Sequence, residues 1–556
     1  MASSTGGSFS LDGATLFTQS TLVLLLTTLT TCVIIWLLYS KDDSGPPSVP
    51  ETIPFISNAY HFLMDMTRFM RRASKAFGDS DLVKFRLGPK RAYILRGQRN
   101  IQALFRPNPD IGSEGFMLLA MKKLWDMSPS DSLKYEKDKS GRLKTPNPGT
   151  ESVRESERYW AGTHHLYSEF LTKAHHANNL AAKFYSLFNE RLDRHQPADE
   201  WATVRILDFL KCHMAESATV SLDGAKILDL NPDFMDLYWA FDKVAVLLAF
   251  GTPRWLIPKA YRLREKYYAT LFRYWESAWK NFDWDGPLVE ADWEENFGSR
   301  FARELARWLR GRGFTDQTAA GMYAVILFGL NSNTVPTATW MLIYIIRDKS
   351  LLDAVRAEAL QAIVVDPATG SRRTLDREKL VSLPLLQSIY TEVLRLHMSV
   401  ALVRETVKPI ILEGHYIPKG AFVQAMTGIS HMEEAVWARD GHPASEFWAA
   451  RHLSYKETKS QDGKIKLEPE FTLAGRTGAF FPFGGGTGMC PGRHFAKQEV
   501  FLAVAAIITR FDVEFVEWTD MDGAKSDREP RSDERYAGSA AMPPDRDIKV
   551  RWKRLW

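Results

Sequence analysis

The chain has 556 residues, 45% of them hydrophobic, so it can bury a large core. Its 71 basic and 67 acidic residues nearly balance, which argues against a nucleic-acid-binding protein. Three cysteines, Cys32, Cys212 and Cys490, are too few for a disulfide framework and fit a reducing compartment. We therefore expect one large catalytic domain preceded by a targeting segment.

The first predicted element is a membrane-spanning helix over residues 16–39, which carry almost no charge. At about 1.5 Å per residue it can cross a hydrocarbon core about 30 Å thick. A cleaved signal peptide fits less well, because no basic residue precedes the apolar run and the run is too long. Lys41 follows the run and no Lys or Arg precedes it, so we expect the body in the cytoplasm. The expected division is a membrane anchor (1–40), a proline-rich hinge (41–54) and a catalytic domain (55–556).

The next elements are short. Apolar and polar residues alternate over residues 82–95 around Gly88-Pro89, which predicts a β-hairpin. A short helix is expected over 98–105, and residues 106–154 show little periodicity. Residues 155–180 are predicted to form a helix with Trp160 and His164 on one face.

Residues 234–282 are strongly apolar and aromatic, and glycine and prolines interrupt them near their middle. This predicts two helices joined by a loop that carries Trp255, Leu256 and Ile257. Flanking Arg254 and Lys259 make such a loop suitable for a membrane surface, and our hypothesis is a second membrane contact there. A turn that faces the core is the alternative.

A long apolar helix is predicted over residues 316–346, with Pro336 inside it. Proline cannot donate to the carbonyl four residues earlier, so the Ser332 carbonyl should lack that partner and the helix should bend. Such a bend, with the polar side chains of Asn333 and Thr334 beside it, offers a binding place for dioxygen and water. Alternatively, these two polar residues only cap the bend.

The C-terminal third is predicted to mix helices and strands. Residues 388–396 form an apolar helix on which Glu392 and Arg395 share one face, and buried charges must be paired. Strands are expected over 402–423 around a Pro-Lys-Gly turn, over 511–518 and near 548–552. A helix is expected over 493–509, and the tail between the last two strands reads as loop.

A glycine-rich loop leads to Cys490 in the stretch FPFGGGTGMCPGRHF that begins at Phe481. Pro491 is suited to the first position of a following helix, so Cys490 should lie where a tight loop becomes a helix. Backbone N–H groups at a helix start lower a thiol's pKa and stabilise the thiolate. A thiolate is the soft ligand that holds haem iron in oxygen-activating enzymes, and glycine lets the backbone lie close to a flat macrocycle.

Phe483, Gly486, Cys490 and Gly492 at this spacing resemble the cysteine loop F-x-x-G-x-R-x-C-x-G of the cytochrome P-450 family. The resemblance covers the chain from the anchor to about residue 518 and implies a mainly helical fold with smaller β-sheets. The family's usual arginine, two residues before the cysteine, is Gly488 here. The same absence marks the branch with sterol 7-hydroxylases and prostacyclin synthase, and the chain resembles a fungal-type natural-product oxidase.

The resemblance also implies roles for individual residues. Cys490 would be the axial ligand of haem b, and Thr334 would relay a proton to bound oxygen. Asn333 stands where the family has Asp or Glu, so proton delivery would run through water oriented by Asn333 and Asn331. As in other microsomal members, the anchor and hinge imply the endoplasmic reticulum membrane.

Other implied roles concern haem retention. Glu392, Arg395 and Arg451 match the family's buried charge triad, which serves folding rather than chemistry. Trp160 and His164 match a motif that binds a haem propionate, although an exposed histidine is usually only solvated. Arg404 would bind the other propionate and carry more of this role because Gly488 cannot.

The function that the resemblance implies is a membrane-anchored monooxygenase. It would insert one oxygen atom from O2 into a lipophilic sterol, terpenoid or related natural product. Electrons would come from NADPH through a flavoprotein reductase, with cytochrome b5 as a second donor, and Lys497 would help to dock the reductase. One alternative is an isomerase or dehydratase that acts on a peroxide without a reductase, and a more remote one is a non-catalytic haem binder.

Overall fold

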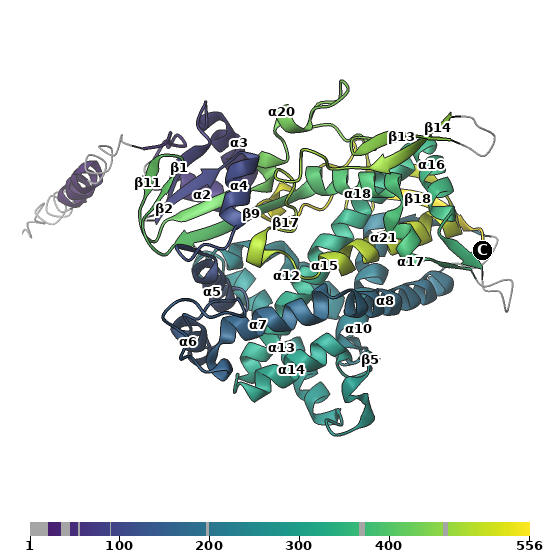
Figure 1. Cartoon of the computed structure of the whole chain (residues 1–556), viewed down its shortest axis with the longest axis horizontal. Coiled ribbons are helices and arrows are strands. Elements are labelled where there is room, and N and C mark those ends of the chain that lie inside the picture. The colour runs from purple at the N-terminus through teal and green to yellow at the C-terminus, as the bar shows by residue number, and fades with distance from the viewer. Residues whose placement is uncertain are drawn as a thin grey trace, which may run out of the picture.

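A computed structural model describes residues 21–34, 45–53, 56–88, 90–195, 200–365, 373–459 and 465–556. In these ranges the protein is mainly helical with several small β-sheets, which confirms the predicted fold class (Figure 1). Figure 1 shows the strands β1, β2 and β9 gathered on one side, and the long helices stacked beside and below them.

The helices are α2 (Ser57–Met64), α3 (Met66–Ala76), α4 (Gln98–Phe105), α5 (Glu114–Lys123), α6 (Pro129–Lys137), α7 (Tyr159–Tyr167), α8 (Ala174–His195), α9 (Ile206–Phe209), α10 (Ala215–Asp223), α11 (Lys226–Asp229), α12 (Phe234–Ala249), α13 (Pro258–Asn281), α14 (Arg300–Gly311), α15 (Asp316–Arg347), α16 (Lys349–Leu360), α17 (Arg377–Ser382), α18 (Pro384–His397), α19 (Thr427–Ser430), α20 (Glu434–Trp437) and α21 (Arg493–Arg510). Short 3-10 or π segments are η1 (Glu155–Glu157), η2 (Ser168–Thr172), η3 (Leu210–Met214), η4 (Pro287–Glu290), η5 (Gly486–Gly488) and η6 (Glu534–Tyr536).

The strands are β1 (Leu82–Leu87), β2 (Lys90–Leu95), β3 (Ile111–Gly112), β4 (Trp201–Arg205), β5 (Trp293–Glu294), β6 (Gly298–Ser299), β7 (Ile363–Val365), β8 (Arg373–Leu375), β9 (Met398–Thr406), β10 (Ile410–Leu412), β11 (His415–Ile417), β12 (Phe422–Met426), β13 (Leu453–Lys459), β14 (Ile465–Phe471), β15 (Phe511–Thr519), β16 (Lys525–Ser526), β17 (Ser539–Ala541) and β18 (Asp547–Arg554). The largest sheet has the order β1-β2-β12-β9-β17, with β3 also paired to β9. A second sheet has the order β16-β15-β18-β4.

The predicted membrane span can be followed only in part. Residues 21–34 are helical and exposed, whereas residues 16–20 and 35–39 lie outside the described residues. In the ranges that the structure describes, no helix combines the length and the apolar character needed to cross a membrane. Of the predicted hinge, residues 45–53 are described, and Ser48 forms an isolated bridge to Lys84 of β1.

Several elements confirm the sequence-based expectations. The β1–β2 hairpin pairs Leu82 with Leu95 through to Leu87 with Lys90, as alternation predicts. Helix α4 has the predicted bounds, and α18, α21, β15 and β18 lie within a few residues of theirs. Helices α12 and α13 are joined by the predicted loop.

In the first half of the chain, one helical region was not predicted and one predicted helix was wrong. Residues 106–154 contain α5 and α6, although little periodicity was visible there. Helix α6 begins with Ser128 as N-cap and Pro129 in its first turn, a start signal that outweighs weak periodicity. The single helix predicted over 155–180 is divided into η1, α7, η2 and α8, because Lys173 is extended after a π segment.

The tail was also predicted wrongly as loop up to its last strand. It contains β17, which pairs Ser539 with Val400 and Ala541 with Met398 of β9. A three-residue strand is too short to show alternation, so only its partner reveals it. This strand brings the tail to the edge of the central cavity described below.

Helix α15 is the central element of the helical part. It contacts α13, α10, α21 and α18, and most of its residues are buried. At its start Thr315 is the N-cap, and the buried carboxylate of Asp131 accepts from the Thr315 and Thr318 hydroxyls at 2.7 and 2.6 Å. Burial raises the pKa of Asp131, but these hydrogen bonds and Lys134 outweigh it and lower the pKa to about 2. A charged, fully bonded carboxylate therefore fixes where the helix begins.

Candidate active site

A cavity of about 780 Å³ lies between the cysteine loop and α15. Residues 486–493 form one side, and Gly329, Leu330 and Thr334 of α15 form another. Most of the remaining lining is apolar and comes from α5, α12, α15 and β9; it includes Phe116, Leu124, Val246, Phe250, Ile326 and Phe328. Cys490 and Thr334, the two residues on which the predicted chemistry depends, thus line the same space.

The cysteine loop is held by its own backbone. The Cys490 N–H donates to the Phe483 carbonyl at 2.8 Å, and Phe483 itself packs against the main core. Gly486 has a φ of +60°, and a Cβ there would lie 1.9 Å from the Phe105 carbonyl oxygen. Only glycine therefore fits this position, because both the conformation and the close approach exclude a side chain.

The Cys490 side chain is open to the cavity. Helix α21 begins at Arg493 with Gly492 as its N-cap, so Pro491 precedes the helix instead of occupying its first position. Burial raises the pKa of the Cys490 thiol, while the N–H groups of Gly492 and Arg493 oppose that rise. The predicted N–H donors are present, but by themselves they do not outweigh burial, and a bound metal ion has to favour the thiolate.

Thr334 has a partner that the sequence reasoning missed. Its Oγ1 lies 2.7 Å from the Leu330 carbonyl and 3.1 Å from Oε1 of Glu499, which comes from α21 and also lines the cavity. One hydroxyl proton cannot serve both acceptors. Burial raises the pKa of Glu499 well above its usual range, so a protonated Glu499 can donate to Thr334 while Thr334 donates to Leu330.

The neighbouring asparagines are placed differently from Thr334. Asn333 Oδ1 accepts from the Ala541 N–H of β17 at 3.0 Å, and Asn333 is not among the cavity-lining residues. The buried Asn331 donates to the Thr219 hydroxyl at 3.1 Å and does not line the cavity either. In this structure the acid nearest Thr334 is therefore Glu499, and the role predicted for Asn333 and Asn331 finds no support in their contacts.

Pro336 lies inside α15, which continues to Arg347. The Tyr238 hydroxyl is buried near Ser332 and forms no hydrogen bond with a described residue. Asn331 Oδ1 is buried and has no hydrogen-bond partner among the described residues. Such buried acceptors are normally satisfied by ordered water.

Arginines gather at one edge of the cavity. Arg404 of β9 forms no ion pair with any described residue, and its Nη2 lies 3.4 Å from the Gly485 carbonyl. Gly488 leaves room for it, because a Cβ on Gly488 would lie only 3.1 Å from Arg404 Nη2. The Arg404 guanidinium thus lies close to the place that a side chain at position 488 would occupy.

Arg142 is a second cationic residue at this edge, and sequence reasoning missed it. It is almost fully buried, and its Nε lies 3.1 Å from Oε1 of Glu114. Burial and the nearby charge of Arg142 both lower the pKa of Arg404. Arg142 pairs with Glu114, whereas Arg404 pairs with no described carboxylate, and this excess of positive charge can bind an anionic ligand.

Trp160 and His164 also line the cavity. The Trp160 indole N–H donates to the Tyr135 carbonyl at 3.0 Å, and the Arg142 guanidinium lies 5.4 Å from the centre of its ring. Trp160 therefore contributes to this edge by packing against the Arg142 guanidinium. His164 lies against the backbone of Thr487, and burial and Arg142 lower its pKa, so its ring is neutral at pH 7.

These residues fit a haem. The cavity offers a thiol on one wall, glycines that bring the loop backbone close, and a cationic edge for two propionate groups. Cys490 would hold the iron, and Arg404, Arg142 and His164 would hold the propionates. The rest of the cavity lining is largely apolar.

The predicted charge triad is present outside the cavity. Glu392 accepts from Arg395 Nε at 2.8 Å and from Arg451 Nε at 2.7 Å, and all three side chains are 0% exposed. His452, which the sequence reasoning missed, adds a contact at 3.1 Å. Arg451 also donates to the carbonyls of Trp437, Pro443 and Glu446. The triad thus joins α18 to the segment that leads to the cysteine loop.

Comparisons with known proteins agree with this geometry. A model of the cytochrome P450 family matches residues 236–527. The cytochrome P450 monooxygenase calL of Penicillium decumbens is 44% identical over 98% of this chain and 100% of its own length. The cytochrome P450 monooxygenase fsoE of Humicola fuscoatra is 29% identical over 92% and 87%. The cholesterol 7-alpha-monooxygenase of Cricetulus griseus is 26% identical over 64% and 67%. The chain is therefore an enzyme that belongs to the cytochrome P450 monooxygenase family.

Proposed function

We propose that this enzyme inserts one oxygen atom from O2 into a lipophilic sterol, terpenoid or related natural product, with electrons from NADPH through a flavoprotein reductase. The observation that carries the proposal is the placement of Cys490 and the Thr334–Glu499 pair on the walls of one largely apolar cavity. Haem b, when bound, supplies the iron at which dioxygen is activated.

The residues of the chain have separate tasks in this proposal. The Cys490 sulfur holds the iron, and the arginines at the cavity edge orient the cofactor. Glu499 holds a proton because burial raises its pKa, and it passes that proton to Thr334 Oγ1 at 3.1 Å. Thr334 then offers a proton to oxygen in the cavity, a task for which Asn333 has no acidic group.

The substrate class follows from the lining. Aromatic and aliphatic side chains from α5, α12 and α15 make most of the cavity lining apolar, which favours a ligand with an apolar surface. A rigid polycyclic molecule loses little conformational entropy when it binds there. A relative named for cholesterol supports this class, although its activity belongs to that protein.

One assay separates this function from its alternative. The purified enzyme is incubated with reductase, NADPH and candidate sterols or terpenoids, and separately with a lipid hydroperoxide. Product that depends on both NADPH and O2 supports the proposal. Turnover of the hydroperoxide without a reductase supports the isomerase or dehydratase, for which the Thr334–Glu499 proton pair has no use.

We also propose that residues 16–39 anchor the enzyme in the endoplasmic reticulum membrane, with the body in the cytoplasm. The exposed leucines of the helix over residues 21–34 support this. Carbonate washing of microsomes should leave the full chain in the pellet, and Leu24→Arg with Leu26→Arg should release it. Retention of that double variant would count against the anchor.

The loop between α12 and α13 supports a second membrane contact. Trp255 is 78% exposed and Leu256 55% exposed, whereas Ile257 packs against the core. Arg254 beside them pairs with Glu265. Trp255→Glu with Leu256→Glu should weaken binding of the anchor-deleted protein to lipid vesicles, and unchanged binding would refute this contact.

Reductase docking was expected to involve Lys497. Its Nζ bonds to Gln387 Oε1 at 2.8 Å, and burial lowers its pKa to about 8. A Lys497→Ala variant should therefore change the KM for reductase only slightly. Cytochrome b5 remains a proposed second electron donor.

A further inference from the structure

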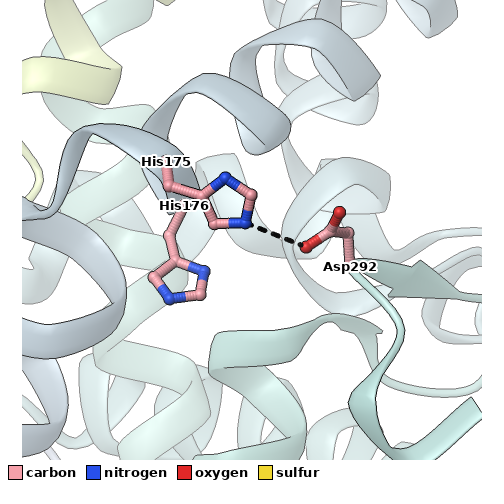
Figure 2. A group of neighbouring side chains, drawn as sticks. All are labelled: His175, His176 and Asp292. Carbon is pink, nitrogen blue, oxygen red and sulfur yellow. Dashed lines mark ion pairs between the residues drawn. The ribbon is translucent and has the colours of Figure 1, made fainter.

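A cluster of metal-ligating side chains lies outside the cavity. His175 and His176 belong to the first turn of α8, and Asp292 directly precedes β5 (Figure 2). One ligand atom from each residue lies within 4.8 Å of the other two. Figure 2 shows the His175 ring directed at Asp292, and His175 Nε2 lies 3.7 Å from Asp292 Oδ1.

We propose that His175, His176 and Asp292 bind a divalent first-row transition metal ion, of which Zn²⁺ is the expected one. Two imidazole nitrogens and one carboxylate oxygen are donors that zinc prefers, whereas Mg²⁺ and Ca²⁺ prefer oxygen ligands alone. Three protein ligands leave one tetrahedral position for water. This site is distinct from the iron ligand Cys490.

Few side chains of the described residues compete for the ring nitrogens. Asn179 Nδ2 lies 3.3 Å from His175 Nε2, and this exposed amide contact has to give way when that nitrogen binds a metal ion. His176 forms no hydrogen bond or ion pair with a described residue, and its ring packs on Phe170 at a centroid distance of 4.9 Å.

A small cavity borders the cluster. It has a volume of about 40 Å³ and is lined by His176 and Asp292 but not by His175, and a single water needs roughly 10–15 Å³. Donor atoms on a tetrahedral zinc ion lie roughly 3.3 Å apart, so the cluster has to contract. The side chains of His175 and Asp292 are 71% and 55% exposed, so they can rotate without disturbing the core.

Such an ion would tie the start of α8 to the segment before β5. These two segments contact each other beside Lys183, whose Nζ lies 3.6 Å from the centre of the Trp293 ring. Because a metal that binds only the folded chain stabilises it, the midpoint of thermal unfolding should rise with the zinc concentration.

The test uses the full chain with its haem, purified without a polyhistidine tag and treated with a chelator. Titration calorimetry with zinc chloride should show one ion per chain. His175→Ala, His176→Ala and Asp292→Asn should each weaken binding by at least ~10-fold and remove the thermal shift. His165→Ala, which removes an exposed histidine of α7 outside the cluster, should change neither.

X-ray absorption at the zinc edge should show nitrogen and oxygen neighbours without sulfur. A sulfur neighbour, together with loss of binding in Cys212→Ser, would assign the ion to the cluster of Cys212, His213 and Glu216 and overturn the proposal. Absence of saturable binding would overturn it too. Because Asp292 is exposed, Asp292→Asn should fold normally, and equal zinc affinity of that variant and the wild type would also contradict the site.

Discussion

Glu392→Gln removes the one negative charge that two buried guanidinium groups share. Glu392, Arg395 and Arg451 are 0% exposed, so no water can replace the lost partner. Removing one member of a buried ion pair costs ~3–5 kcal/mol, because the remaining charges stay buried without compensation. We expect a loss of that size here, although glutamine keeps the volume of the side chain.

The pKa of Glu392 gives a second value for the stability that its charged carboxylate contributes. Burial raises this pKa, but hydrogen bonds from Arg395 and His452 outweigh burial and lower it from 4.5 to about 2. At about 1.4 kcal/mol for each pKa unit, this corresponds to ~3 kcal/mol of stability. Because the folded-state pKa is the lower one, this stability is present above about pH 4.5 and is lost as the pH falls toward 2.

The assay is the free energy of unfolding by denaturant at pH 7, together with the fraction of purified protein that retains haem. Glu392→Gln should lower both, and Glu457→Gln is the matched control on an exposed strand, where a change within about 0.5 kcal/mol is expected. If Glu392→Gln unfolded at the denaturant concentration of the wild type and kept its haem, the structural role of the triad would be refuted.

Three further substitutions address the cavity. Arg404→Leu should speed haem transfer to a haem acceptor protein by ~10–100-fold, since one charge-assisted contact is lost, and an unchanged rate would exclude Arg404 from propionate binding. Glu499→Gln should reduce product formed per NADPH by ~10-fold or more while haem content stays normal, and undiminished coupling would remove Glu499 from proton delivery. Gly486→Ala should abolish haem retention, because its Cβ would meet the Phe105 carbonyl. Gly149→Ala is the control, since Gly149 has a φ of +82° but open space around it, and this variant should keep its haem. Equal haem content in the two variants would show that the cysteine loop tolerates a side chain at position 486.

The sequence was most informative where a local pattern carries the function. The spacing of Phe483, Gly486 and Cys490 and the i, i+3 pair of Glu392 and Arg395 depend on a few neighbouring residues, and both features are present. The β1–β2 hairpin was predictable for the same reason, since strict alternation determines its register.

Other parts of the site depend on which segments meet in space. Glu499 is the only acidic residue of α21. The rule that buried charges need partners could have singled it out, but that rule could not have shown its contact with Thr334. Arg142 lies in a segment without periodicity, so no pattern marks it. Asn333 accepts a hydrogen bond from Ala541 of β17 and does not line the cavity. Sequence reasoning could not show this, because β17 is too short to predict.

The most direct test of the central claim is the absorption spectrum of the reduced, carbon-monoxide-bound enzyme. We expect the wild type and Cys212→Ser to show the band of thiolate-ligated haem, because Cys212 lies outside the cavity. Cys490→Ser should lose that band. If Cys490→Ser kept it, residue 490 would not be the iron ligand, and the cavity between the cysteine loop and α15 would have to be reinterpreted.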